Sequence, residues 1–332
     1  MANITAADIA KLRAMTAAGL MDCKQALTES DGDFDKAIEF LRKKGQKIAS
    51  KRQDRDAKEG CVLSGVTADG KTAVIVVVNC ETDFVAKNAD FIAFTKSILD
   101  KALDVLPADA EALKQEVVNG SKIADLLSDQ MGKIGEKIDL GYYEKVSAEH
   151  SFAYTHPGNR LASIVSFDAK VADPQVGKDV AMQIAAMSPV AVDQNSVPQS
   201  VIDSELSIAK EKTIQEQIQK AVEVALKKAG INPNLVDSEE HMSSNIAKGW
   251  LTEDEAAKAR EIKEKVADEK KDNIPAAMVE NIAKGRLNKF FKESTLMNQE
   301  FVKDGNLTIA QYMDAAQKGL KVVSFKRFGL SN

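Results

Sequence analysis

A run of β-branched residues that follows a turn signal places the strongest limit on the fold of this chain. Residues 61–79 alternate between polar and apolar side chains and then fill with valine, in the stretch "TAVIVVVN". Asp69 and Gly70, just before this stretch, are a strong signal for a tight two-residue turn between paired strands. The pattern therefore predicts a β-hairpin.

A second β-rich region repeats this order of elements. "IDLGYYEKV" alternates loosely, and "SFAYTHPGNRLASIVSF" carries a Pro-Gly-Asn turn between two strand-like runs. A helical pattern follows at 174–187, so both regions have the order strand, turn, strand and helix, which indicates an internal duplication. Alternation at 320–330 adds a late strand. Together they predict an α+β fold with antiparallel sheets. The helices expected between the two regions lie at 85–105, 108–118 and 121–136.

The first 45 residues predict three short helices with a small core. Apolar residues recur in them at helical spacing, and capping residues precede the runs. The charged stretch 46–60 lacks a clear apolar stripe and is expected to be a linker, in part helical. The start and end signals are Thr5 for the first helix, Gly19 and Asp22 before the second, and Asp33 and Gly45 at the two ends of the third.

Leu20 and Met21 lie in the first loop of this three-helix unit. In one interpretation they are exposed and offer a docking surface. In the other they close the small core. Exposed apolar residues are common, so the residues alone do not separate the two.

Residues 201–292 are almost all helical in pattern and highly charged. Their apolar stripes are narrow and flanked by polar residues, which suits an antiparallel, coiled-coil-like helical hairpin that projects from the rest of the chain. The stretch is rich in alanine and thin, so a partner or a second copy of the chain would cover it.

Composition narrows the classes of function. The chain has 332 residues, enough for two or three domains, and a net charge of −5 with both signs interspersed, which argues against direct nucleic-acid binding. It lacks an apolar leader and a window long enough to span a membrane. Three cysteines without C-x-x-C spacing fit a reducing cytoplasm. Three histidines without metal-ligand spacing predict no metal site and no cofactor. Residues for nucleophilic or metal catalysis are few, which disfavours an enzyme without excluding one.

"GVTADGKT", residues 65–72, matches the letters of a phosphate-binding loop. Such a loop must follow a strand and open a helix, because the phosphates rest on amides at a helix N-terminus. Here a β-branched run follows Thr72. A nucleotide hydrolase is therefore a disfavoured alternative.

"ETDFVAKN", at the end of the valine-rich strand, has two interpretations. In the first, Thr82 or Asp83 caps the helix that begins at Val85, and Phe84 tucks beneath that helix. The residues alone favour this interpretation, because most aromatic side chains near helix starts are buried. In the second, Asp83 and Phe84 stand on a rigid corner and enter a pocket of another protein, as aromatic anchors do.

Several separate blocks of the chain resemble one family. "LRAMTAAGLMDCKQAL", "GDFDKAIEFLRKKG", "VNCETDFVAKNADF" and "KIGEKI" are similar, in order and spacing, to stretches of bacterial elongation factor Ts. "HPGNRLASIV", "GRLNKFFKESTLMNQEFV" and "VVSFKRF" look like later blocks of that family. The similarity covers most of the chain and is far more specific than any single pattern above.

The resemblance implies a guanine nucleotide exchange factor for the GTPase elongation factor Tu, and not an enzyme. In the family, the stretch that matches Thr82, Asp83, Phe84 and Val85 pushes into the GTPase near its Mg²⁺ site. A passive protein-binding adaptor is the alternative. The N-terminal contact positions are Arg13, Leu20 and Met21. The implied parts are a ubiquitin-associated-like module at 1–45, a linker at 46–60, core subdomains at 61–137 and at 138–200 with 293–332, and an inserted hairpin at 201–292 used in homodimer contacts.

The chain also departs from the family pattern in two places. The helical insert looks about fifty residues longer than in well-known members, which bears on the dimer geometry that the family implies. Gln183 and Met187 stand where His and Lys are expected in some relatives.

Overall fold

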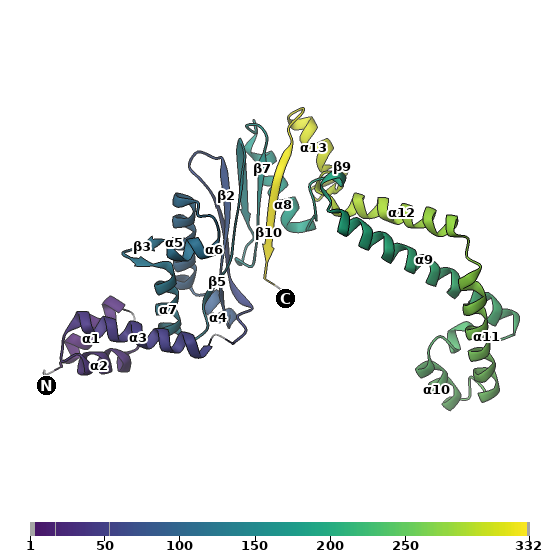
Figure 1. Cartoon of the computed structure of the whole chain (residues 1–332), viewed down its shortest axis with the longest axis horizontal. Helices are drawn as coiled ribbons and strands as arrows, with labels where there is room; N and C mark the ends of the chain where they lie inside the picture. Colours follow the sequence, from purple (N-terminus) through teal and green to yellow (C-terminus); the bar gives the residue numbers. More distant parts are fainter. Residues whose placement is uncertain (1–3, 17, 53, 331–332) are drawn as a thin grey trace. The chain divides into compact units, whose positions relative to one another are not determined.

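A computed structural model describes residues 4–16, 18–52 and 54–330 of the protein. Its contacts divide the chain into two units (Figure 1). The first contains Met1–Val192 and Gln299–Asn332, and the second contains Asp193–Asn298, which is wider than the insert expected at 201–292. Each unit has its own buried core.

The N-terminal part of the first unit forms three helices, α1 (Ala6–Thr16), α2 (Leu20–Glu29) and α3 (Phe34–Arg52). Thr5 and Asp33 accept hydrogen bonds from the first turns of α1 and α3, so both predicted caps are confirmed. Asp22 is not a cap, because α2 begins two residues earlier and Gly19 precedes it. The fully buried side chains of this small core are Leu12, Cys23, Ala26, Leu27 and Ala37.

The prediction that α3 ends at Gly45 is wrong, because the helix continues to Arg52. The glycine serves a close approach between helices instead. A Cβ atom on Gly45 would lie 3.0 Å from the backbone oxygen of Ser128, and one on Gly132 would lie 3.0 Å from the Cα atom of Gly45. The two glycines thus let α3 lie against α7 (Ile123–Ile134).

The first sheet contains β1 (Glu59–Val66), β2 (Thr72–Cys80) and β5 (Asp139–Ser147), in the order β1-β2-β5, all antiparallel. The predicted hairpin between β1 and β2 is present. Its connection spans residues 67–71, which is longer than the expected two, and Gly70 adopts a φ of +74° there. The stretch that matches a phosphate-binding loop is therefore a strand-to-strand turn and opens no helix.

Strand β2 lies at the centre of the first sheet, and its side chains are buried on both faces. Val74, Val76 and Val78 pack against helices on one face. Ala73, Ile75 and Val77 pack toward the second sheet on the other. The elements that follow β2 are α4 (Asp83–Ala86), α5 (Ala89–Val105), α6 (Ala110–Gln115), β3 (Val117–Val118), β4 (Ser121–Lys122) and α7.

The second sheet contains β6 (His150–Thr155), β7 (Leu161–Phe167) and β10 (Val322–Gly329), in the order β10-β7-β6. Helix α8 (Pro174–Met187) packs against β6 and β7. The first unit thus stacks helices, two antiparallel sheets and a helix, and the α+β prediction is confirmed. Both halves contain a hairpin followed by a helix. The remaining elements are β8 (Glu300–Phe301), β9 (Asp304–Thr308) and α13 (Ile309–Ala316).

The second unit is more than the two-helix hairpin that the sequence predicts. Helix α9 (Gln199–Lys228) packs against both α12 (Ala276–Ser294) and α11 (Glu253–Asp272) (Figure 1). The chain turns at Gly230, at Gly249 and before α12, so the returning arm is broken into separate helices. The shorter elements are η1 (Gln194–Ser196), η2 (Pro233–Leu235), α10 (Glu239–Ala247) and η3 (Leu296–Asn298).

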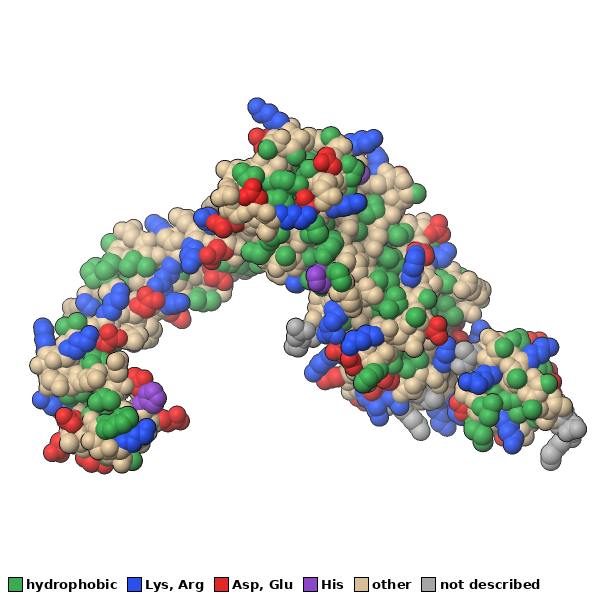
Figure 2. Space-filling view, turned by 180° about the vertical axis from the view of Figure 1, so that it is seen from behind, with side chains coloured by type: hydrophobic (Ala, Val, Ile, Leu, Met, Phe, Trp, Pro, Cys, Tyr) green, Lys and Arg blue, Asp and Glu red, His purple; other side chains and the backbone are tan. Residues whose placement is uncertain are grey.

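The surface carries charges of both signs. Lys and Arg side chains are interspersed with Asp and Glu over the face seen in Figure 2, in keeping with the small net charge. Over the described parts of the chain, no helix combines the length and the apolar character needed to cross a membrane.

Candidate functional site: an exposed aromatic on a strand-to-helix corner

The corner after β2 is built from two helix caps in succession. Thr82 is the N-cap of the one-turn helix α4, and its hydroxyl accepts a hydrogen bond from the backbone N–H of Val85 (3.5 Å). Asn88 then caps α5 by accepting from the N–H groups of Asp90 (2.8 Å) and Phe91 (3.4 Å). The sequence predicts one continuous helix from residue 85, but the Asn88 cap divides it in two.

Phe84 is 83% exposed, so the interpretation that the residues alone favoured, a ring buried beneath the helix, is wrong. Val85 packs against the core cluster of the first sheet in its place, and Ala86 is buried. A single helical turn can direct only one side of its surface toward the core. Because Val85 and Ala86 take that side, the ring of Phe84 points into solvent.

Asp83 is partly exposed and forms an ion pair with Lys87, whose Nζ lies 2.6 Å from the carboxylate. The hydrogen bond from Lys87 lowers the pKa of the Asp83 carboxyl, so Asp83 is ionised at neutral pH. Asp83 directly precedes Phe84 in the chain. The corner therefore presents an aromatic face and a carboxylate together.

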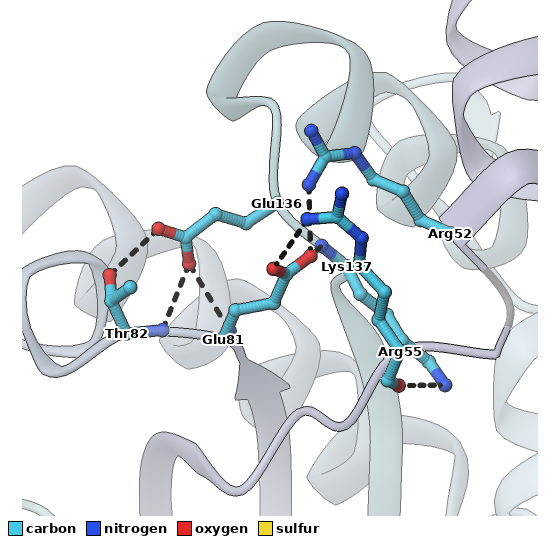
Figure 3. A network of polar contacts seen from close by, with 6 residues as sticks. All are labelled: Arg52, Arg55, Glu81, Thr82, Glu136 and Lys137. Carbon is cyan, nitrogen blue, oxygen red and sulfur yellow. Dashed lines mark hydrogen bonds and ion pairs between the residues drawn. The ribbon is translucent and has the colours of Figure 1, made fainter.

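Glu136 holds the backbone of the corner (Figure 3). Its Oε2 accepts hydrogen bonds from the backbone N–H groups of Glu81 (3.1 Å) and Thr82 (3.0 Å). Its Oε1 accepts from the hydroxyl of Thr82 (2.7 Å). Glu136 follows Gly135, which ends α7 in a left-handed conformation, so this turn brings the carboxylate back to β2.

Glu81 holds the corner from the other side. Its carboxylate accepts hydrogen bonds from the guanidinium groups of Arg52 (3.0 Å) and Arg55 (3.1 Å) and from the backbone N–H of Lys137 (2.6 Å). The hydrogen bond from Lys137 is the main cause that lowers the pKa of the Glu81 carboxyl, and the two arginines act in the same direction. Three chain segments therefore meet at one carboxylate.

Sequence reasoning missed both glutamates. "KIGEKI" stands out only as a block of family resemblance, and nothing in its local pattern indicates that Glu136 reaches a strand end more than fifty residues away. A signal was nevertheless present. The glycine that ends α7 is followed at once by an acidic residue, and the strand that ends at Cys80 leaves two backbone N–H groups in need of acceptors.

The predicted N-terminal residues are also exposed. Arg13 lies on α1, and Leu20 and Met21 open α2 with 55% and 70% of their surfaces accessible. The small core closes without them, which answers the question that the residues left open. Met15 on α1 is exposed as well, although its spacing of three residues from the buried Leu12 predicts a place on the inner face.

A cavity of about 470 Å³ lies between this three-helix unit and helices α5 and α7. Met15, Leu41 and Phe94 contribute its apolar lining. Asp129 also lines it, and burial raises the pKa of its carboxyl. The cavity includes none of the residues of the corner, so it is a separate feature.

Gln183 is fully buried in α8, in the second half of the unit. Its amide nitrogen donates to the backbone oxygen of Glu300 (3.0 Å), and its amide oxygen accepts from the N–H of Val302 (3.0 Å). It thus ties α8 to the segment that returns after the second unit. Met187, at the end of the same helix, is exposed.

These features define a class of protein. A large aromatic side chain stands in solvent on a corner where two carboxylates, those of Glu81 and Glu136, accept six hydrogen bonds. Aromatic residues displayed in this manner are typical of anchors in protein–protein interfaces. The corner is therefore a candidate docking site for another protein, as such anchors are in protein-binding proteins.

Comparison with known proteins identifies the family. The family described as "Elongation factor TS" matches residues 81–332, well over half of the chain. An elongation factor Ts of Phocaeicola vulgatus is 51% identical over 98% of both chains. Those of Porphyromonas gingivalis and Amoebophilus asiaticus are 44% and 45% identical, again over at least 98% of both chains. The chain belongs to the elongation factor Ts family, and the near-complete overlap shows that these relatives have about the same length.

Proposed function

We propose that this chain is a guanine nucleotide exchange factor for elongation factor Tu and acts in translation elongation in the cytoplasm. It binds the nucleotide-free GTPase and promotes release of GDP by disturbing the Mg²⁺ site. Membership of the elongation factor Ts family supports the partner and the process. The observation that carries the proposal is the exposure of Phe84 on a fixed corner.

The mechanism requires no covalent chemistry. Bound Mg²⁺ neutralises phosphate charge, so displacing the ion, or the groups around it, exposes anion repulsion and loosens the nucleotide. A protein that binds the nucleotide-free GTPase more tightly than the loaded one lowers nucleotide affinity by the same factor, because the two binding free energies are linked. Phe84 wedges the pocket, and Asp83, which is ionised and adjacent, makes polar contacts with the GTPase.

Arg13, Leu20 and Met21 form a second contact surface on the GTPase. Leu20 and Met21 are exposed apolar side chains next to each other at the start of α2, and Arg13 is exposed on α1. This surface increases affinity and does not reach the nucleotide. Its loss raises the concentration of factor needed for half-maximal exchange and leaves the maximal rate nearly unchanged.

The direct test is release of labelled GDP from elongation factor Tu in the presence of excess unlabelled nucleotide. An exchange factor accelerates release in proportion to its concentration until the GTPase is saturated. A passive adaptor binds the GTPase without accelerating release, and that result would refute the proposal. The isolated chain is expected to bind no nucleotide, since residues 65–72 form a turn between strands.

The second unit provides a homodimer contact in this proposal. Ile208 on α9 is apolar and about half exposed, as is Val224 on a different face of the same helix, so each offers apolar surface for a second chain to cover. Changing both residues to glutamate is expected to convert a dimer into a monomer in a solution mass measurement. A wild-type chain that is already monomeric at high concentration would remove this part of the proposal.

A further inference from the structure

We propose that Glu136 is a positioning residue for exchange, which fixes the corner that carries Phe84, and that Glu81 is its second anchor. This inference rests on the proposed function, because it assigns to the two carboxylates the task of aiming the exchange residue. Neither side chain touches the GTPase in this account. Both act through the backbone of Glu81, Thr82 and the start of α4.

The contacts of Glu136 fix the point from which α4 begins. Two consecutive backbone N–H groups and the side chain of Thr82 converge on one carboxylate, at distances between 2.7 and 3.1 Å. Hydrogen bonds to an ionised acceptor are stronger than those between neutral groups. Three such bonds to adjacent atoms leave the Thr82 backbone little freedom to rotate, and the hydroxyl they orient is also the cap of α4.

The contacts of Glu81 add segments that are distant in the chain. Arg52 is the last residue of α3, Arg55 lies in the connection after it, and Lys137 follows Glu136 directly. The Nζ of Lys137 also donates to the backbone oxygen of Arg55 (2.9 Å). Figure 3 shows the two glutamates side by side, with Thr82 on one flank and the arginines on the other.

The corner needs this support because α4 cannot hold its own shape. Helix α4 has four residues, and a single helical turn is unstable by itself, since nucleation costs more than the first hydrogen bond returns. Phe84 is too exposed for its own packing to orient it. The ion pair between Asp83 and Lys87 lies at the surface, where such pairs contribute little. The direction of the ring is therefore set by the backbone on which Glu136 acts.

The experiment compares GDP release from elongation factor Tu stimulated by the full-length chain carrying Glu136→Ala, Glu136→Gln, Phe84→Ala, or both alanine changes. Glu255→Ala is the matched control. In the second unit, Glu255 accepts from the N–H and the hydroxyl of Thr252, both at 2.8 Å, so the substitution removes the same kind of cap away from the corner. Thermal unfolding of every variant checks that it is folded. Amide hydrogen exchange at residues 81–85 reports whether the corner has loosened.

Glu136→Ala is expected to reduce the stimulated release rate roughly five- to tenfold and to speed amide exchange at 81–85, since charge-assisted bonds to the backbone amides of Glu81 and Thr82 are lost. Glu136→Gln keeps an acceptor oxygen and restores most of the rate. In the Phe84→Ala background, Glu136→Ala has little further effect on release, because the ring that Glu136 positions is already absent. Glu255→Ala leaves release unchanged.

Wild-type stimulation by a folded Glu136→Ala protein would overturn the inference. So would a double variant whose loss of release rate equals the product of the losses of Glu136→Ala and Phe84→Ala. A corner that loosens without any change in release would overturn it as well. These outcomes differ from failure of the proposed function, in which the wild-type chain itself does not accelerate release. In that case amide hydrogen exchange still shows whether Glu136 fixes the backbone of the corner. The proposed role of Glu136 in nucleotide exchange is then refuted together with the proposed function.

Discussion

The two hairpin–helix corners of the first unit occupy equivalent places in the order of elements, but one displays an exposed apolar side chain and the other buries one. Between β2 and α4 the chain needs only two residues, and the helix then displays Phe84 with 83% of its surface exposed. Between β7 and α8 it runs through residues 168–173 and buries Val171, which is 2% exposed. The backbone N–H of Val171 donates to the ring of His150 (3.0 Å), which ties the second corner to its own sheet.

A repeated order of strands and helix therefore does not imply a repeated functional site. Hydrogen bonds to the carboxylates of Glu136 and Glu81 fix the first corner, and they leave Phe84 exposed to a partner. The second is closed by packing, with Gln183 also turned inward to bind the 299–302 segment. Exchange is therefore expected to depend on the first corner, while substitutions at the second mainly affect stability.

The largest expected effect on stability comes from Gly177→Val in α8. A Cβ atom at Gly177 would lie 2.3 Å from ring atoms of Phe152, which is itself held between His150 and Phe167. Overpacking of this kind costs about 3 kcal/mol of the free energy of unfolding. Denaturant unfolding measures it. Gly285→Val is the control, since a Cβ there meets nothing within 4 Å, and an equal loss at both sites would show that helix propensity alone is responsible.

Val171→Ala tests the comparison at the second corner itself. Removing two buried methyl groups is expected to cost about 1.5 kcal/mol of unfolding free energy. The maximal rate of GDP release stimulated by the folded variant should equal that of the wild type. A variant of normal stability that stimulates release poorly would place a functional contact at the second corner and break the comparison.

The smallest effect concerns the pH dependence of the first corner. The pKa of Glu81 is lowered from its ordinary value of 4.5, so the ionised carboxylate stabilises the fold above that pH, and this contribution is lost as the pH falls below it. Partly exposed charge pairs contribute about 1 kcal/mol or less. The stability difference between wild type and Glu81→Gln, measured by denaturant unfolding, should shrink below pH 4.5, and a difference independent of pH would contradict the assignment.

Much of the fold follows from local patterns in the sequence. The valine run from Val74 predicts the hairpin, and Thr5 and Asp33 predict the starts of α1 and α3, because capping and side-chain alternation are properties of adjacent residues. Gly45 predicts a helix end that is absent, because this glycine instead allows close contact with Gly132. Gly132 lies on another helix, which only the tertiary structure brings near. The break of the second unit into several helices was also missed, since its apolar stripes alone do not fix where the returning arm turns.

The candidate site was predictable in part for the same reason. Family resemblance marks Phe84, but burial statistics for aromatic residues point the wrong way for it. The decisive fact is that Val85 and Ala86 take the inner side of a helix only one turn long. The acidic residue after Gly135 hints at Glu136 as an acceptor, but local pattern does not identify its hydrogen-bond partners, because they lie more than fifty residues away in the chain.

The most direct test of the central claim compares two quantities for Phe84→Ala, its stability and its stimulation of GDP release from elongation factor Tu. An exposed side chain contributes little to folding, so the unfolding free energy should stay within about 0.5 kcal/mol of wild type. Release should be stimulated roughly thirtyfold less, because anchors of this kind contribute about 2 kcal/mol or more and about 1.4 kcal/mol corresponds to a factor of ten. A folded Phe84→Ala protein that stimulates release as well as wild type would contradict the account.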